Sequence, residues 1–299
     1  MPFSCRMVYV AALLAPFWVV AGEEPAGPES GLDSKLAERH RRTVALGEVL
    51  EASGQWERAA EQYEMARRIR DDDIHVLTQL ASLYRARAED AKTLSVYAAL
   101  CRLQPASVAW LREVGSCHFR LGQREQAEAV WGKILEVQPS RAFALRYLAE
   151  IYASHGLHEK AVGACRDALA LSPNDEDIRQ RLGEALLAAG DPLAALAASS
   201  RLAADRSSAR AERARRLRQG AFQALDLPAA VRGAVEARLA EGPCGAADLA
   251  WAAARCLEEK GETKRAASFY RRLAKEEPDT PRGKEAAEKA RRPDPGNTP

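Results

Sequence analysis

The chain lacks most of the signatures of an enzyme or of a nucleic-acid-binding protein. It contains no glycine-rich phosphate loop and no nucleophile elbow, which argues against the common nucleotide-dependent and hydrolase classes. Its net charge is only +2 and its pI is near 8.2, which is too mild a balance to indicate nucleic acid as a partner. No cysteine pair has CxxC spacing, and no cysteine–histidine set has the spacing of a zinc site. We therefore expect a protein that is not an enzyme and that holds no metal or other cofactor.

Aromatic residues are scarce as well, at 6% of the 299 residues. Hydrophobic residues nevertheless make up 47% of the chain and charged residues 29%, so there is ample apolar material for a folded core. Because alanine supplies much of that material, the composition favours thin helices that pack close together.

Small side chains recur along the chain at one fixed spacing, which is the length of the segment 142–175. The eighth position of each unit carries Gly47, Ala81, Gly115, Ala149 and Gly183, and the twentieth carries Ala59, Thr93, Ala127, Ala161 and Ala195. Larger residues occupy the twenty-fourth position, at Tyr63, Tyr97, Trp131 and Cys165. Small residues recurring in this way predict helix pairs that cross closely, with the larger side chains behind the crossing.

Glycine and proline mark the ends of the predicted helices. Gly54, Gly122, Gly156 and Gly190 are placed to end the first helix of each pair in a left-handed cap, and Pro105, Pro139 and Pro173 to stop the second. Five consecutive units without insertion or deletion indicate a stacked repeat array. The pattern resembles the tetratricopeptide repeat family, and this resemblance implies an all-α, right-handed α-solenoid of stacked antiparallel helix pairs.

The repeats and their flanks divide the whole chain. Residues 33–209 contain five repeats, at 40–73, 74–107, 108–141, 142–175 and 176–209. A degenerate repeat at 210–246, a sixth repeat at 247–280, a capping helix at 281–292 and a disordered tail at 293–299 follow. Residues 22–32 are rich in Gly, Pro and Glu and are expected to form a disordered linker.

Residues 1–21 have the pattern of a secretory signal peptide. Arg6 precedes an apolar run over residues 7–20, and Ala21 offers a small residue at the cleavage position. The run is shorter than the ~20 residues of a membrane span, so we favour a cleaved signal over an uncleaved anchor. These features predict an exported, periplasmic or cell-envelope protein without a stable membrane span.

Export would place the remaining cysteines in an oxidising compartment. They are Cys101, Cys117, Cys165, Cys244 and Cys256. Cys101 and Cys117 fall on helices of adjacent repeats, so a disulfide between them is conceivable, although packing as small core residues is favoured because disulfide geometry is demanding.

The family resemblance implies a site for a protein or peptide partner. In this family the first helices of successive repeats line a concave groove. Carried onto this sequence, the groove positions are Arg85, Arg112, Phe119, Arg120, Phe143, Arg146 and Gln180. Arginines flanked by phenylalanines suit an acidic or C-terminal peptide, so we expect a scaffold or adaptor that supports assembly of an envelope protein complex.

Two other functions remain open at this point. One is an accessory domain of an envelope enzyme system, active through Cys244, Cys256 or the pair His155 and His158. The other is a purely structural spacer without a groove ligand.

Arginines at 206, 210, 213, 215, 216 and 218 form a basic stretch that could meet anionic lipid or an acidic partner, but a solvated helix face is favoured. Acidic runs at 71–73 and 174–177 are expected to cap helices.

Overall fold

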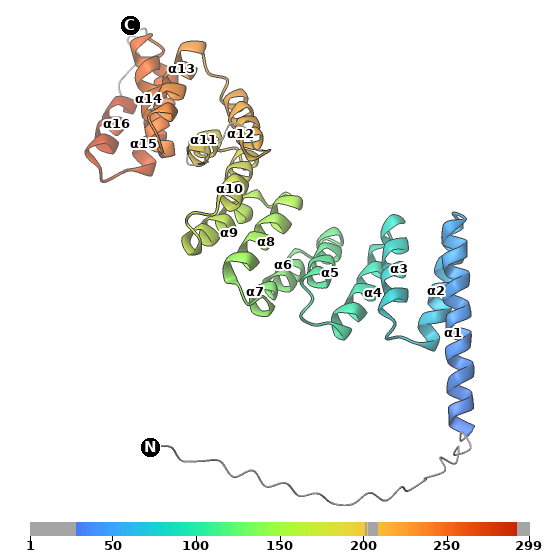
Figure 1. Ribbon diagram of the computed structural model, residues 1–299. Helices are drawn as coiled ribbons and strands as arrows, with labels where there is room; N and C mark the ends of the chain where they lie inside the picture. The colour runs from blue at the N-terminus through green and yellow to red at the C-terminus, as the bar shows by residue number, and fades with distance from the viewer. Residues whose placement is uncertain (1–27, 201, 203–208, 292–299) are drawn as a thin grey trace, which may run out of the picture. The chain divides into compact units, whose positions relative to one another are not determined.

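The computed structural model describes residues 28–200, 202 and 209–291. Within these ranges the regular secondary structure is entirely α-helical. The chain divides into two units, Met1–Arg87 and Ala88–Pro299. In both, antiparallel helices stack in pairs, which confirms the predicted all-α repeat architecture (Figure 1).

The described residues of the first unit, 28–87, form three helices. They are α1 (Pro28–Ala52), α2 (Trp56–Ile69) and α3 (Ile74–Ala86). Helix α1 pairs with α2, and α3 packs on α2. The start of α1 lies inside the segment 22–32 that was expected to be disordered, so that boundary was wrong. Proline suits the first turn of a helix because its missing N–H has no partner there. The predicted signal peptide at 1–21 lies outside the described residues.

The second unit contains the remaining described helices. They are α4 (Asp90–Leu103), α5 (Val108–Arg120), α6 (Arg124–Gly132), α7 (Ile134–Val137), α8 (Arg141–Ser154), α9 (His158–Leu171), α10 (Glu176–Ala188), α11 (Pro192–Ser200), α12 (Ala209–Leu225), α13 (Ala229–Ala240), α14 (Ala246–Glu259), α15 (Thr263–Glu276) and α16 (Pro281–Arg291). The predicted tail at 293–299 lies outside the described part of the chain.

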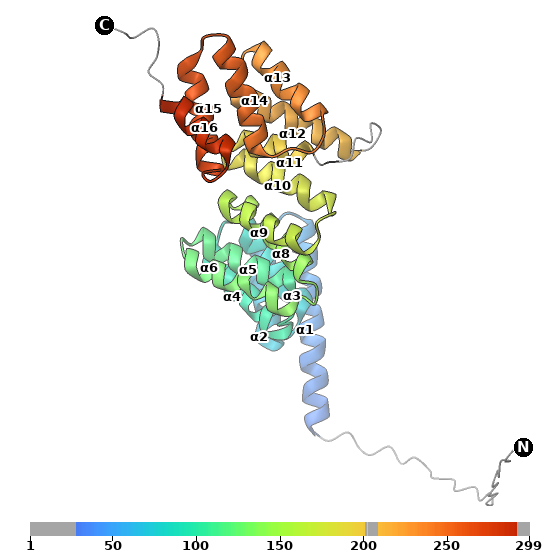
Figure 2. The same cartoon turned by 90° about the vertical axis from the view of Figure 1, so that its left-hand side faces the viewer.

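Most neighbouring helices of the second unit form closed hairpins. Such pairs are α5 with α6, α8 with α9, α10 with α11 and α14 with α15, and each hairpin packs on the next (Figure 2). The exception is the degenerate repeat, where α12 packs on α10 and α11 while α13 packs on α14, and α12 and α13 barely touch each other. Helix α16 packs on α15 at the C-terminal end of the array.

The turns within the hairpins adopt the predicted left-handed conformation. Gly54, Gly122, Gly156, Gly190 and Gly261 have φ between 72° and 82°. An added Cβ would meet no atom within 4 Å at any of them, so the glycines are needed for their conformation and not for space. The second repeat lacks this glycine and places Ala88 in the same region, with φ 55°.

The small eighth-position residues face a different neighbour from the one expected. A Cβ added to Gly115 would lie 2.1 Å from Trp131 Nε1, and one added to Gly47 would lie 2.8 Å from the Tyr63 ring. The eighth position therefore accommodates the large side chain at the twenty-fourth position of the same hairpin. In the fifth repeat, a Cβ added to Gly183 would meet Leu217 of α12, at 2.4 Å.

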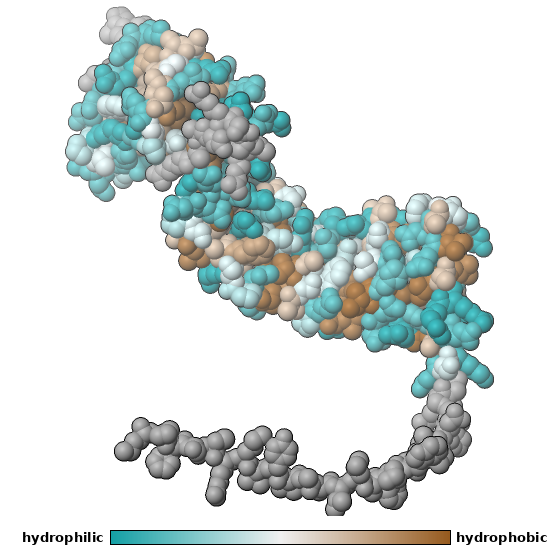
Figure 3. All heavy atoms as spheres, viewed as in Figure 1, coloured by the Kyte–Doolittle hydropathy of each residue, from teal (hydrophilic) through white to brown (hydrophobic). Residues whose placement is uncertain are grey.

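The acidic runs cap helices, as predicted. The Asp73 carboxylate accepts hydrogen bonds from the His75 and Val76 amides, at 2.9 and 3.2 Å. The Asp175 carboxylate accepts one from the Ile178 amide, at 3.0 Å. In the space-filling view, hydrophobic residues appear as separate patches among hydrophilic ones, because most apolar side chains are packed between the helices (Figure 3).

Candidate functional site

A cleft of about 380 Å³ opens on the first helices of successive hairpins in the second unit. It is lined by Arg146, Tyr147 and Glu150 of α8, by Asp177, Gln180, Arg181 and Glu184 of α10, and by Arg213 of α12. The fixed repeat spacing brings equivalent positions together, since Arg146 and Gln180 share the fifth position of their repeats and Glu150 and Glu184 the ninth. We call this surface the polar cleft.

Two aromatic rings and two arginines form a layered group at one end of the polar cleft. The rings of Phe143 and Tyr147, one helical turn apart on α8, lie 6.4 Å apart and nearly parallel. The Arg146 guanidinium lies 5.0 Å from the Phe143 ring centre, and that of Arg112 lies 6.0 Å from the Tyr147 ring centre. Both separations are within the range of cation–π attraction.

The arginine on α5 is held in place by this group. A hydrogen bond with Tyr147 raises the pKa of the Arg112 guanidinium above its ordinary value, against the opposing effect of burial. From the other side, the Trp131 indole donates to the Arg112 main-chain carbonyl, at 3.2 Å. The large side chain behind the hairpin thereby fixes the helix that presents Arg112.

The polar cleft contains both signs of charge. Three arginines line it together with three carboxylates, so its positive charge is balanced within the cleft. Arg181 forms an ion pair with Glu150 at 3.3 Å, and the Gln180 amide donates to Glu184 at 2.9 Å. Gln180 is only 8% exposed, which fixes its amide at the floor of the cleft. Such a surface offers both hydrogen-bond donors and acceptors to a bound chain.

The structure separates the predicted groove residues into three groups. Arg146 and Gln180 line the polar cleft, and Arg112 and Phe143 adjoin it through Tyr147. Phe119 and Arg120 lie outside the lining of the cleft. Arg85 is exposed on α3 of the first unit.

Phe119 and Arg120 have structural contacts instead of groove positions. The half-buried Phe119 ring packs against Trp131 at 5.9 Å and His155 at 5.0 Å. The Arg120 guanidinium donates to Asp90 of α4 and to the Cys117 sulfur. The last turn of α5 therefore faces the adjoining helices, and these two residues do not line the polar cleft.

Arg213, which the sequence analysis placed in the basic stretch, lines the polar cleft. Sequence reasoning also missed Tyr147 and Arg181 as cleft residues. Both stand at the sixth position of their repeats, next to the fifth-position residues that were assigned. The sequence signal that could have identified them is a polar or aromatic residue at both the fifth and the sixth position, in the fourth repeat and again in the fifth. It went unused because the family's groove positions do not include the sixth.

The residues weighed for catalysis or metal binding have ordinary structural surroundings. Cys244 is buried, and Cys101, Cys117, Cys165, Cys244 and Cys256 are all free thiols. Burial raises the pKa of Cys165 to about 11, which leaves it an unreactive thiol. Across residues 28–200 and 209–291 no three His, Cys, Asp or Glu side chains are grouped so as to hold a metal ion.

The part of the chain that the structure describes also holds no helix long and apolar enough to cross a membrane. The fold and the polar cleft together define an α-helical repeat protein with a binding surface on the first helices of its hairpins. Residues 115–176 and 248–280 match two profiles described as tetratricopeptide repeat. The chain therefore contains tetratricopeptide repeats, which commonly serve as scaffolds for protein interactions.

Curated and solved relatives are distant. The human protein O-mannosyl-transferase TMTC1 is 26% identical over 143 residues, which are 48% of this chain and 16% of that protein, so the chain spans only a small part of this relative. A tetratricopeptide repeat protein from Parabacteroides merdae aligns over 90% of this chain and 88% of its own, at 18% identity and a TM-score of 0.41. YrrB, titled a TPR protein with an unusual peptide-binding site, aligns over 68% of this chain and 100% of its own, at 14% identity and a TM-score of 0.42.

Proposed function

We propose that this protein is an exported, non-catalytic scaffold that holds a segment of a partner protein in the polar cleft and supports assembly of a cell-envelope complex. The observation that carries the proposal is the layered group of Arg112, Tyr147, Phe143 and Arg146 beside the cleft. Its aromatic faces and guanidinium groups are presented together at the surface, with Phe143 41% exposed.

The chemistry of the cleft suggests what kind of segment it binds. A carboxylate of the ligand, including a C-terminal one, would accept charge-assisted hydrogen bonds from Arg146 and from Arg213, which has no ion pair within the described residues. Glu184 and Asp177 offer acceptors for main-chain amides of the same segment. An extended acidic or C-terminal peptide with a hydrophobic side chain against Phe143 satisfies both sets of groups.

The exported location rests on the sequence of residues 1–21. A basic residue, an apolar run and a small residue at the end of it are the three parts of a signal peptide. A repeat scaffold released outside the cytoplasm would meet its partners in the cell envelope, and that is the basis for the assembly role.

The test is a pull-down from an envelope extract with residues 22–299 as bait. One variant carries Arg146→Glu, which reverses a charge in the polar cleft. Its matched control carries Arg166→Glu, an exposed arginine on the second helix of the same hairpin and outside the cleft. We expect a partner that the wild type and the Arg166→Glu control capture and that Arg146→Glu loses, with all three baits equally helical by circular dichroism.

The other results distinguish the remaining functions. A partner captured equally by all three baits would move the binding surface away from the polar cleft. No partner on any bait would favour the structural spacer. A captured enzyme whose turnover depends on the bait would favour the accessory-domain function.

A further inference from the structure

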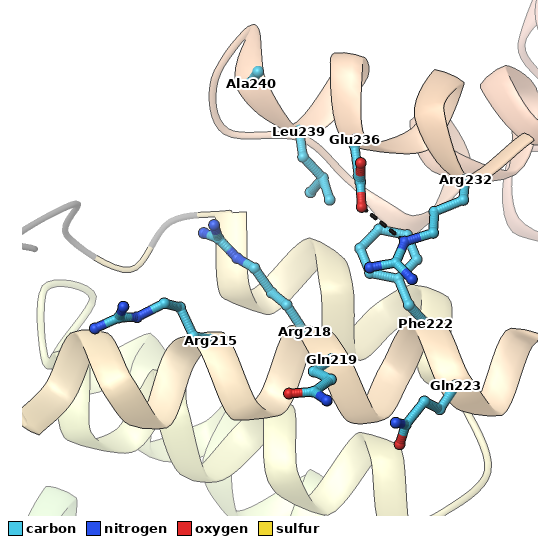
Figure 4. A pocket seen from close by; sticks show the side chains of 9 residues that line it. All are labelled: Arg215, Arg218, Gln219, Phe222, Gln223, Arg232, Glu236, Leu239 and Ala240. Carbon is cyan, nitrogen blue, oxygen red and sulfur yellow. Dashed lines mark hydrogen bonds and ion pairs between the residues drawn. The ribbon is translucent and has the colours of Figure 1, made fainter. Parts of the chain in front are cut away.

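A second and larger cleft, of about 520 Å³, lies between the two helices of the degenerate repeat. Its lining comes from α12 and α13 (Figure 4). The lining residues are Arg215, Arg218, Gln219, Phe222, Gln223, Arg232, Glu236, Leu239 and Ala240. We call it the arginine cleft. It is separate from the polar cleft, to which α12 contributes only Arg213.

The arginine cleft exists because the degenerate repeat is an open hairpin. In the neighbouring hairpins the two helices pack along each other, whereas α12 and α13 each pack on other helices. Helix α13 buries Val231 and Val235 while packing on α14, and α12 buries Leu217 against Gly183 of α10. The facing sides of α12 and α13 are therefore left without a helical partner.

The arginines across this opening are oriented by their neighbours. Arg218 donates to the hydroxyl and the main-chain carbonyl of Ser199, at 3.0 and 2.8 Å. Arg232 is paired with Glu236 at 2.8 Å, and its guanidinium lies 4.9 Å from the centre of the Phe222 ring. A guanidinium has five N–H donors, so each keeps donors for a ligand after these bonds are made.

The charge of the lining is one-sided, unlike that of the polar cleft. Arg215 joins these two arginines and forms an ion pair with Glu212 outside the cleft, at 3.9 Å, while Glu236 is the single carboxylate in the lining. Because Glu236 is already paired with Arg232, the cleft presents an excess of positive charge. Apolar surface lies between these groups, from Phe222, Leu239 and Ala240. Figure 4 shows Leu239 directed into the space between Arg218 and Arg232.

We propose that the arginine cleft binds an acidic segment of a partner protein that carries a hydrophobic side chain next to its carboxylates. The carboxylates complement the excess guanidinium charge, and the hydrophobic side chain packs beside Leu239, since Phe222 is only 7% exposed and is covered by Arg232. A protein segment suits the site better than a small molecule because most lining residues are exposed. Sites for small molecules typically bury about 70–90% of the ligand surface. The protein would then hold two segments at once, one in each cleft.

The basic stretch singled out in the sequence is divided by this arrangement. Arg213 lines the polar cleft, Arg216 pairs with Glu212 on the exposed side of α12, and Arg215 and Arg218 line the arginine cleft. Arg216 is therefore a matched control for Arg215, since it is an exposed arginine on the same helix that lies outside both clefts.

The test uses residues 22–299, which include every described residue, and a random twelve-residue peptide library displayed on phage. Enriched peptides are resynthesised with fluorescein, and their binding is measured by fluorescence polarisation. The variants are Arg215→Glu, Arg232→Glu and Gln219→Glu, with Arg216→Glu and Arg146→Glu as controls. Gln219→Glu adds a negative charge to the exposed lining without removing a hydrogen bond that we observe, so it keeps the test valid if Arg232→Glu unfolds the repeat.

We expect enriched peptides in which Asp or Glu adjoins Leu, Phe or Trp. Among the peptides that Arg146→Glu still binds, Arg215→Glu should weaken binding by about tenfold, the usual effect of losing a charged hydrogen bond. Gln219→Glu should weaken it by a similar factor, because its carboxylate repels the carboxylates of the peptide, and Arg216→Glu by less than about twofold. Absence of enrichment, enrichment of peptides without acidic residues, or binding that Arg215→Glu leaves unchanged would overturn the proposal. Peptides that Arg146→Glu no longer binds belong to the polar cleft. If every enriched acidic peptide is of this kind, the arginine cleft has no ligand and the proposal is overturned.

A membrane surface is the alternative source of negative charge. Phosphatidylglycerol vesicles that bind the wild type and the Arg216→Glu control but not Arg215→Glu, without enrichment of any acidic peptide, would assign the cleft to lipid and overturn the peptide proposal.

Discussion

At the scale of single residues, the fit between Gly115 and Trp131 couples the packing of a hairpin to its binding surface. The fully buried Trp131 ring occupies the space that a Cβ on Gly115 would need. The same indole donates to the carbonyl of Arg112, the residue that α5 contributes beside the polar cleft. A change at Gly115 should therefore displace the ring and disturb Arg112 with it.

We expect Gly115→Ala to destabilise the protein by about 1–3 kcal/mol, the usual cost of overpacking a core. Trp131→Phe should cost less on its own and should relieve the clash, so the double variant should be more stable than the sum of the two effects predicts. Urea denaturation of the four proteins measures this coupling. Strict additivity would contradict the packing argument.

Ala88 shows the opposite situation, a residue other than glycine at a position that glycine suits. Its φ of 55° places it in the left-handed region that five equivalent glycines occupy in other repeats. Ala88→Gly should stabilise the protein by about 0.5–1 kcal/mol, because the left-handed conformation costs an L-residue about that much. Gly122→Ala, with no neighbour within 4 Å of the added Cβ, should destabilise by a similar amount. Thermal melts of both variants test this pair, and shifts of the same sign would contradict it.

At the scale of helices, the hairpins could be predicted from the sequence because their signals are local. Glycine in the turns, aspartate at the helix starts and small residues at fixed spacing each act within one hairpin. The open hairpin of α12 and α13 could not be predicted, since it depends on which helix each one packs against. Leu217 shows why: it is apolar at a helical position, but only the structure shows that it packs against Gly183.

A polar cluster around Lys289 holds the C-terminal helix α16 against α14 and α15. Lys289 donates to the Glu258 carboxylate at 2.8 Å, and its ammonium lies 5.6 Å from the Trp251 ring centre. Tyr270 donates to the same carboxylate at 2.7 Å. Lys289→Met should lower the stability of the protein by about 1 kcal/mol at neutral pH, because it removes an ion pair and a cation–π contact but keeps the aliphatic stem.

The pH dependence of this cluster follows from its pKa shifts. The hydrogen bond to Glu258 raises the pKa of Lys289, and burial with the bond to Glu258 raises the pKa of Tyr270 to about 12. Both groups hold their protons more tightly in the folded state, so their stabilisation is complete below about pH 10 and is lost as the pH rises through the raised values. The melting temperature should therefore fall more steeply between pH 9 and 11.5 in the wild type than in a Tyr270→Phe/Lys289→Met double variant. Equal slopes would show that the cluster does not contribute.

At the scale of the whole molecule, the binding surface was predictable only in part. The repeat register brought Arg146 and Gln180 to one surface, because equivalent positions of stacked hairpins must lie side by side. It did not predict that Phe119 packs on Trp131 and that Arg120 pairs with Asp90, because these contacts depend on how neighbouring helices pack. The arginine cleft left no trace in the register, since it arises where the repeat pattern fails.

The location of the protein is the remaining prediction at this scale, and it depends on residues 1–21 alone. If Arg6, the apolar run and Ala21 form a signal peptide, then the chain expressed in a bacterial host should appear in the periplasmic fraction with Gly22 as its first residue. N-terminal sequencing and the intact mass give the cleavage site directly. Replacing Ala21 with a bulky residue such as Trp should leave the precursor uncut and attached to the membrane, while Ala26→Trp, beyond the site, should be processed normally. An intact N-terminus in the cytoplasmic fraction would contradict export and, with it, the envelope partners that the proposed scaffold requires.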